Sequence, residues 1–216
     1  MSARIRFCFD PLCPWCYQTS RWVRDLEQRG EVAVSWGLFS LEIANADGDT
    51  AALGETANAA MALRTAVALR EAEGNQALGD FYAALGEAVH QRGEDVSDIG
   101  VVSAALEQAG MPSALIDKAM GDPGTWTAVE TEHRSLVERT RSFGVPTIVL
   151  DDGEGPAIFG PVISEVPAPD DAVELWRHVS WLARYENFSE LKRDRSIDPD
   201  LESYRRYIAS REAGSQ

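Results

Sequence analysis

Two cysteines, Cys13 and Cys16, stand three residues apart in the stretch FCFDPLCPWCY, residues 7–17. Residues at i and i+3 share one face of a helical turn, so the two sulfurs can reach disulfide geometry. With Cys13 at the N-cap, Pro14 takes the first helical position, where its missing N–H costs nothing. The free N–H groups of that turn favour thiolate over thiol at Cys13. The pattern predicts a nucleophile at Cys13 and a more buried, resolving thiol at Cys16.

A Cys-x-x-Cys pair can belong to a metal centre, a redox centre or a purely structural pair. A structural zinc site takes a second Cys or His pair at short spacing. Cys8 is the only other cysteine here, and the three histidines are scattered singly at positions 90, 133 and 178. We therefore favour thiol–disulfide chemistry and expect no metal.

Cys8 calls for a separate interpretation, because it stands between Phe7 and Phe9 in the middle of an expected strand. A small buried hydrophobe is expected at such a position, and a free cysteine behaves as one. We predict that Cys8 is an inert core residue.

Hydrophobic periodicity indicates the elements that position the pair. Residues 4–9 alternate between polar and apolar side chains, as in a strand. Apolar residues then recur at helical spacing from Trp15 to Gln28, and Gly30 ends that helix. Residues 31–39 alternate again. The pair is therefore expected at the first strand-to-helix junction of a β–α–β unit.

A helical block follows this unit. Residues 40–55 are rich in Asn, Asp and Gly and are expected to form a loop. Apolar residues at 3–4 residue spacing, such as Leu78, Phe81 and Leu85, then indicate helices up to about residue 141.

The last part of the chain predicts a β–β–α unit. Two short strands, at 146–150 and 156–159, are joined by DDGEG, in which Gly supplies the turn. A final helix is expected from about residue 170 to 188. Beyond residue 191 the chain is polar and mixed in charge, and we expect partial disorder there.

With the helical block removed, the element order is that of an α/β thioredoxin-like fold, an identification that also depends on the motif. The predicted core comprises residues 1–45 and 143–192, with an all-helical insertion after the second strand, residues 46–142. We expect this insertion to form a lid over the strand–helix junction. Residues 193–216 would form a C-terminal extension with some flexibility.

Composition excludes several classes of partner. The formal net charge is −15, which argues against nucleic acid and against an anionic membrane surface. No stretch approaches the ~18 apolar residues that span a bilayer, and the first residues lack the pattern of a secretory signal. We expect a cytoplasmic protein, in a compartment where thiols stay reduced. No GxGxxG follows a strand, so no dinucleotide is implied.

At FDPLCPWCY, residues 9–17, and GVPTI, residues 144–148, the chain resembles the DsbA-like branch of the thioredoxin superfamily. In that branch a Val or Thr and a cis-proline face the Cys-x-x-Cys, and the matching residues are Val145 and Pro146. Such a proline holds an extended backbone against the catalytic sulfur and exposes N–H and C=O groups to a thiol substrate. The sequence itself leaves the isomer open, because most X–Pro bonds are trans.

The segments FDPLCPWC, TSRW, SLEIAN, FGPVISEVP and FSELKR, spread from residue 9 to residue 193, look like the actinobacterial mycothiol-dependent nitroreductase group. This resemblance implies an enzyme that takes electrons from mycothiol, or another low-molecular-weight thiol, without a flavin. The electrons would pass to a nitro-aromatic or disulfide substrate. Cys13 would be the attacking thiolate and Cys16 the resolving thiol.

The resemblance also implies binding residues around the pair. Pro14 and Trp15 would form part of the substrate wall, although Trp15 has a core residue as its alternative. Asn45 and His90 match positions that line the cleft between core and lid. Asn45 could equally be a turn residue, and His90 a partly exposed residue near a helix end, where a cation is favoured. Phe159, Gly160 and Pro161 would end the last strand near the same cleft.

The basic run LKRDR, residues 191–195, has two interpretations. It could meet the carboxylate of a thiol cofactor, or it could be a solvated helix end.

Two other classes of protein compete with this prediction. Kappa-class glutathione transferases and hydroxychromene-carboxylate isomerases share the fold and the insertion but use a single Ser or Cys, so Cys16 favours redox exchange. A thiol-holding chaperone or polyketide-assembly accessory protein would bind partners in the cleft without turnover. The sequence makes no prediction of oligomeric state.

Overall fold

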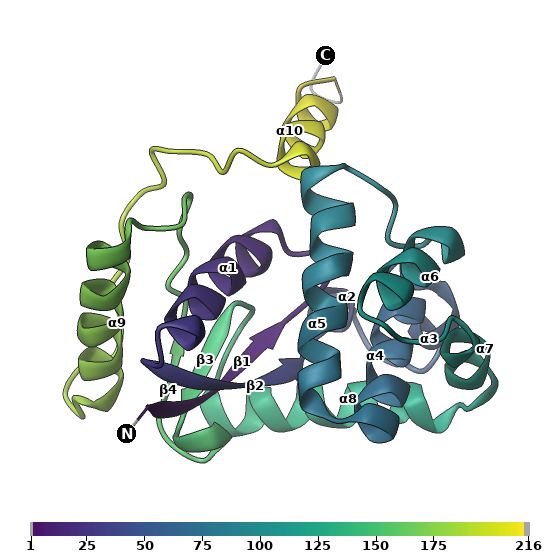
Figure 1. Cartoon of the computed structure of the whole chain (residues 1–216), viewed down its shortest axis with the longest axis horizontal. Coiled ribbons are helices and arrows are strands. Elements are labelled where there is room, and N and C mark those ends of the chain that lie inside the picture. Colours follow the sequence, from purple (N-terminus) through teal and green to yellow (C-terminus); the bar gives the residue numbers. More distant parts are fainter. Residues whose placement is uncertain (1, 214–216) are drawn as a thin grey trace.

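The structure, a computed structural model that describes residues 2–213, is built around one mixed sheet (Figure 1). Its four strands lie in the order β2-β1-β3-β4. Strands β1 and β2 pair in parallel, whereas β1 with β3 and β3 with β4 are antiparallel. The strands are β1 (Ala3–Phe9), β2 (Val32–Leu38), β3 (Thr147–Leu150) and β4 (Ala157–Phe159). This arrangement confirms the predicted α/β, thioredoxin-like fold class.

Helix α1 (Pro14–Gln28) makes the parallel crossover between β1 and β2, as predicted. Helix α9 (Pro169–Arg184) packs beside it, on the outer side in Figure 1. The Trp22 indole N–H donates to the Ala172 carbonyl at 3.0 Å, and the Trp22 and Trp176 rings lie 6.4 Å apart. Helix α9 ends earlier than predicted, because Tyr185 has an extended backbone.

The chain between β2 and β3 is helical, in agreement with an insertion after the second strand. Helices α5 and α8 cover opposite faces of the sheet. Phe9 stacks on Tyr82 of α5 at 3.6 Å, whereas residues of α8 lie against Arg6 and Cys8 of β1. The five longer helices of this inserted segment are α4 (Ala60–Glu73), α5 (Asn75–Gly86), α6 (Ile99–Gln108), α7 (Ala114–Gly121) and α8 (Gly124–Thr140). The exact division into core and lid stays a prediction, and its outermost residues, 1 and 214–216, lie outside the described residues.

Three short elements correct the sequence prediction. The expected loop at 40–55 contains α2 (Leu41–Ala44) and reaches into α3 (Leu53–Thr56). The Ser40 hydroxyl caps α2 by accepting from the Ile43 N–H, a local bond that periodicity does not reveal. A π-helical turn, η1 (Glu87–Gln91), continues α5.

The β3–β4 connection also differs from the expected glycine turn. It is a single 3-10 turn, η2 (Asp151–Gly153). Asp151, Asp152 and Gly153 all have positive φ, at 53°, 59° and 93°. The two aspartates share the left-handed region with the glycine, which Asp tolerates better than most side chains.

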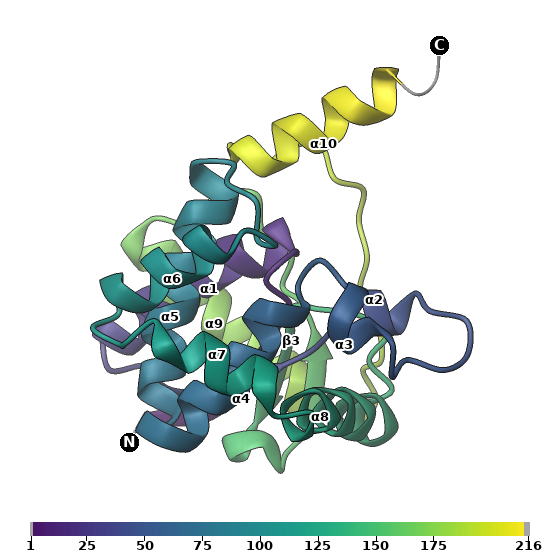
Figure 2. The same ribbon diagram turned by 90° about the vertical axis from the view of Figure 1, so that its right-hand side faces the viewer.

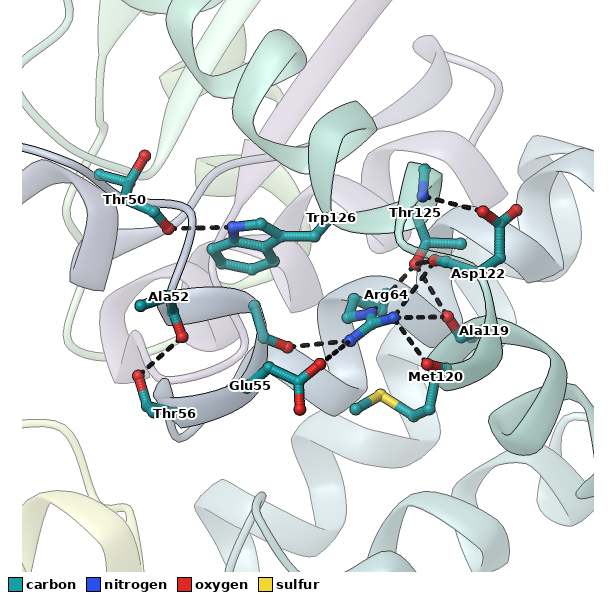
Figure 3. Close-up of polar contacts among 12 residues, drawn as sticks. Thr50, Ala52, Glu55, Thr56, Arg64, Ala119, Met120, Asp122, Thr125 and Trp126 are labelled. Atoms are coloured by element: carbon teal, nitrogen blue, oxygen red, sulfur yellow. Dashed lines mark hydrogen bonds and ion pairs between the residues drawn. The ribbon is translucent and has the colours of Figure 1, made fainter.

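A buried arginine holds the helices of the insertion together (Figure 3). Arg64 of α4 is only 2% exposed and donates to the carbonyls of Ala119, Met120 and Asp122 at the end of α7. The last carbonyls of a helix lack partners within it, and the negative end of its dipole favours a cation. Arg64 therefore satisfies acceptors that burial would otherwise leave unpaired.

The C-terminal extension ends in α10 (Glu202–Ala213), an element that the sequence pattern did not predict. Its first turn packs against η1, and the rest projects from the body of the protein (Figure 2). Within residues 2–213, no helix is long and apolar enough to cross a membrane.

Candidate active site

Cys13 is the N-cap of α1, where the sequence analysis expected it. The Cys16 backbone N–H donates to Cys13 Sγ at 3.2 Å, so the sulfur receives one of the free donors of the first helical turn. The thiol in turn donates to the Val145 carbonyl oxygen at 3.6 Å. The side chain is only 5% exposed. The backbone N–H donor and the positive end of the helix dipole thus both lie at this sulfur, an arrangement found at nucleophilic cysteines.

Cys16 lies one turn inside the helix and is fully buried. Burial raises the pKa of the Cys16 thiol well above its ordinary value, and a hydrogen bond to Cys13 raises it further. Both cysteines are free thiols in the structure. Cys16 is therefore the more deeply buried of the two thiols, as predicted, and the roles assigned to Cys13 and Cys16 stay predictions.

Asp10 is a member of the site that the sequence analysis missed. Its carboxylate accepts the Leu12 N–H at 2.6 Å and the Leu41 N–H at 2.5 Å. Asp10 therefore connects α2 to the active-site loop, by which we mean residues 10–13 between β1 and α1. Burial raises the pKa of Asp10 to about 7, and the two backbone bonds oppose this shift. The charge of Asp10 also contributes to the raised pKa of Cys16. An acid that directly follows a buried strand and precedes a Cys-x-x-Cys helix was the available signal.

The Val145–Pro146 peptide bond is cis. Both residues are buried beside Cys13, which bonds to the carbonyl of Val145. The Gly160 N–H donates to the Pro146 carbonyl at 2.8 Å, and the Thr19 hydroxyl donates to the Pro161 carbonyl at 2.9 Å. The segment that follows β4 therefore lies close to α1 and to the loop that contains cis-Pro146, which we call the proline loop.

Trp15 is half-buried and packs against the edge of the hydrophobic core, and its role in a substrate wall stays a prediction. Tyr204 of α10 meets the indole edge to face, with ring centroids 5.7 Å apart. The Arg195 guanidinium carbon lies 4.8 Å from the centre of the same ring. The C-terminal extension therefore covers the tryptophan, a contact between residues too distant in sequence for periodicity to predict. Pro14 is half-buried at the start of α1.

His90 lies in η1 and is 1% exposed, so the alternative of a partly exposed, charged helix-end residue is wrong. One ring nitrogen, Nε2, lies 2.9 Å from the Pro11 carbonyl, and the other, Nδ1, lies 2.8 Å from Ser203 Oγ. Burial lowers the pKa of His90 to about 4, so the ring is neutral near pH 7. His90 links the active-site loop to α10.

Asn45 is exposed at the C-cap of α2, and its side-chain N–H donates to the Leu41 carbonyl of the same helix at 2.7 Å. This contact is the local, turn-type alternative for Asn45. The link from α2 to the site passes instead through the Leu41 N–H and Asp10. A binding role for Asn45 stays a prediction.

Cys8 lies on the other face of the sheet, 2% exposed. Burial raises the pKa of the Cys8 thiol to about 12, and the charge of Glu132 adds to this effect. A cavity of about 500 Å³ between the sheet and α8 is lined by Arg6, Cys8, Glu132 and Arg139, among others.

Among the residues that the structure describes, no group of three or more His, Cys, Asp or Glu side chains is arranged to hold a metal ion.

A family comparison bears on this geometry. Residues 12–193 match the model of the Rv2466c-like family, described as mycothiol-dependent nitroreductase Rv2466c. The chain belongs to this family. A curated relative, the uncharacterized protein Rv2286c of Mycobacterium tuberculosis, is 34% identical over 193 residues, which cover 89% of this chain and 82% of the relative. Family membership makes the protein a thiol-dependent oxidoreductase, as the sequence resemblance implied.

Solved structures are similar in fold. The cytosolic disulfide reductase DsbM from Pseudomonas aeruginosa has a TM-score of 0.59 and 16% identity, over 82% of this chain and 99% of that one. A 2-hydroxychromene-2-carboxylate isomerase has a TM-score of 0.57 and 16% identity, over 84% of this chain and 96% of that one. At these identities the likeness extends to the fold alone, because one fold hosts different chemistries.

Proposed function

We propose that the protein is a dithiol reductase in which Cys13 and Cys16 carry two electrons from a low-molecular-weight thiol, mycothiol, to an oxidised substrate. The substrate would be a nitro-aromatic compound or a disulfide. The observation that carries the proposal is the unequal pair at the start of α1. Cys13 Sγ accepts an N–H of the first helical turn, whereas Cys16 is fully buried with a raised pKa. We assign the reaction to the cytoplasm, where thiols stay reduced.

With a disulfide substrate, the Cys13 thiolate attacks one sulfur, and the other sulfur leaves as a thiolate. Cys16 then loses its proton and attacks Cys13, which releases the second thiolate and leaves a Cys13–Cys16 disulfide. With a nitro-aromatic compound, the same two electrons and two protons yield the nitroso compound and water. Two molecules of the thiol donor reduce the enzyme disulfide and leave as their own disulfide, so each cycle balances.

Asp10 supplies a proton acceptor for the second step. Cys16 is fully buried, and a thiol attacks only after it loses its proton. A carboxyl group with a pKa of about 7 is half ionised near neutral pH, so it can both accept and return a proton. Asp10 is also close enough to Cys16 for its charge to act on that thiol.

Cys16 also favours this function over a transferase or isomerase. Those enzymes need one residue that positions a thiol, whereas a second thiol one helical turn away can resolve a mixed disulfide. A binding protein without turnover has no need for the resolving thiol either.

A trapping experiment tests the proposal. Cys16→Ser keeps the attacking thiol but removes the resolving one, so a covalent adduct at Cys13 should accumulate in cells that make mycothiol. Mass spectrometry of the purified variant should find mycothiol on Cys13 at near-stoichiometric yield. Cys8→Ala, which keeps both site cysteines, is the matched control and should carry no adduct.

A redox titration of the unmodified protein gives the opposing outcome. If Cys13 and Cys16 never form a disulfide at any potential, the reductase function is wrong. A peptide in place of mycothiol on Cys13 would instead indicate a protein disulfide substrate.

A further inference from the structure

The C-terminal extension contributes a cation to the active site. The family match ends at residue 193, whereas the described chain continues to residue 213. We propose that Arg195 binds a carboxylate of the oxidised substrate, so that the enzyme prefers substrates with an anionic group beside the reacting atoms. This inference rests on the proposed reductase function and specifies the substrate class.

The position of Arg195 is fixed by the elements around it. Leu201, just before α10, is 1% exposed, so the extension is anchored by burial. Ser203 lies 2.8 Å from His90, and the Arg206 guanidinium donates to the Gly93 carbonyl at the end of η1. The Ser164 hydroxyl donates to the Ile197 carbonyl at 2.5 Å, which ties the preceding segment to the body of the protein.

The Arg195 guanidinium is held in a way that leaves its donors available. It lies over the Trp15 ring at 4.8 Å, a contact that uses the flat face of the group. The five N–H groups of a guanidinium point outward from its edges, in the fork that matches a carboxylate. Within residues 2–213, the Arg195 side chain makes no ion pair and donates no hydrogen bond.

The charged groups next to Arg195 do not neutralise it directly. The Asp194 carboxylate accepts the backbone N–H of Arg195 at 2.9 Å, and the Asp198 carboxylate accepts the Tyr204 hydroxyl at 2.9 Å. Lys192 and Arg193 add two further cations that form no ion pair among the described residues. In a chain with a net charge of −15, Arg195 is thus a guanidinium without an ion pair among the described residues, and it lies over the tryptophan of the motif.

The location of Arg195 gives the proposal its chemical consequence. Trp15 is the residue between Pro14 and Cys16 of the motif, and Arg195 lies over its ring, so under the proposal a carboxylate bound by Arg195 would be held next to the motif. Salt screens interactions between exposed charges more than about 8 Å apart at physiological ionic strength. A carboxylate in direct contact with Arg195 is therefore attracted to it, while the repulsion from distant acidic residues is largely screened. An aromatic carboxylate would also gain contact with Trp15 and Tyr204.

Two aromatic disulfides of different charge test the inference. The probes are dianionic 5,5′-dithiobis(2-nitrobenzoate) and uncharged 4,4′-dithiodipyridine, each mixed with the fully reduced protein. In both reactions the enzyme dithiol becomes the Cys13–Cys16 disulfide, and the probe disulfide becomes two thiols. Stopped-flow absorbance gives the second-order rate constant for each probe, at low and high salt.

Arg195→Gln should lower the rate constant for the dianionic probe about tenfold and that for the neutral probe less than twofold, because only the first loses a charge-assisted bond. It should also weaken the salt dependence with the dianionic probe. Arg195→Lys, which keeps the charge without the fork, should be intermediate. Arg177→Gln, on an exposed face of α9, makes the same charge change and should alter neither rate.

An equal loss with both probes, or no loss with either, would overturn anion recognition by Arg195. An equal effect of Arg193→Gln would also overturn it, because the preference would then belong to the whole basic run. A wild-type protein that reduces neither probe would instead overturn the reductase function itself. Thermal melts of each variant identify any change that comes from loss of folding.

Discussion

Cys8 and Cys13 are five residues apart, yet the structure gives the two thiols different backbone surroundings. Cys8 lies within β1, where its backbone pairs with Gly37 of β2 and Thr147 of β3. Its neighbours' N–H groups are used by the sheet, so none is left for the sulfur. Cys13 lies at the start of a helix, where N–H groups have no partner within the helix and one binds its sulfur. The backbone element, more than the residue type, determines which sulfur receives an N–H donor.

The two regions also differ in open space, and the larger space lies beside the thiol that the proposed function does not use. The cavity of about 500 Å³ adjoins Cys8, whose pKa is raised to about 12. Cys13 is 5% exposed, and Trp15 beside it is covered by Tyr204 and Arg195. The cavity therefore adjoins Cys8 rather than the proposed nucleophile. The proposal for Cys13 depends instead on the N–H donor at its sulfur.

The largest expected difference between the regions is in reaction rate. Cys13→Ser should lower the rate of reduction of 4,4′-dithiodipyridine at least about a thousandfold, because a serine hydroxyl cannot ionise to replace the thiolate. Cys8→Ala should stay within about twofold of wild type, since its buried thiol takes no part. The comparison would break if Cys8→Ala lost activity to a similar extent, or if Cys13→Ser kept more than a tenth of the rate.

Asp10 should make the stability of the active-site region depend on pH. Its pKa is about 7 in the folded protein and about 3.9 in an unfolded chain. Between these values only the folded state binds the proton, so the free energy of unfolding falls as pH rises from about 4 to 7. Between pH 5 and pH 8 this contribution decreases by about 2–3 kcal/mol.

Urea unfolding at several pH values measures this effect as the difference between wild type and Asp10→Asn. The variant lacks the titrating group, so it should not show this part of the pH dependence. Asp170→Asn, at an exposed position in the first turn of α9, is the matched control and should follow wild type. Parallel pH profiles for wild type and Asp10→Asn would mean that Asp10 has an ordinary pKa.

The sequence predicted the parts of the site that depend on local structure. Strand alternation and helical spacing are properties of adjacent residues, and Pro14 after Cys13 is a local capping signal. These features were enough to locate β1, α1 and β2 and the unequal positions of the two cysteines. The proline loop required the resemblance, because nothing local to Val145 and Pro146 indicates a partner more than 130 residues earlier.

The features that the sequence missed depend on contacts between distant segments. Helix α10 gave no periodic signal, because only its first turn packs against the body while the rest projects. His90 is buried between Pro11 and Ser203, and neither contact can be inferred from a single histidine. Asp10 was not identified as a site residue from the sequence, although its carboxylate accepts the Leu12 and Leu41 N–H groups and so closes the loop before α1.

The smallest expected effect concerns packing at Cys8. A Cβ added at Gly37 would lie 2.9 Å from Cys8 Sγ and 3.2 Å from Cδ of Arg6. Gly37→Ala should therefore destabilise the protein by about 1–3 kcal/mol, as overpacking of a core does. Cys8→Ala alone should cost about 1 kcal/mol through lost contacts. In the double variant the new methyl group occupies the space that the sulfur leaves.

Urea unfolding of the four proteins in this cycle should give a coupling free energy of about 1 kcal/mol that favours the double variant. Gly37→Ala combined with Cys13→Ser is the control pair and should be additive, because Cys13 does not contact Gly37. Additivity in the Cys8 pair would show that the sulfur is not what the methyl group meets. A coupling there, with activity unchanged, would assign the Cys8 sulfur to packing and leave the redox chemistry to Cys13 and Cys16.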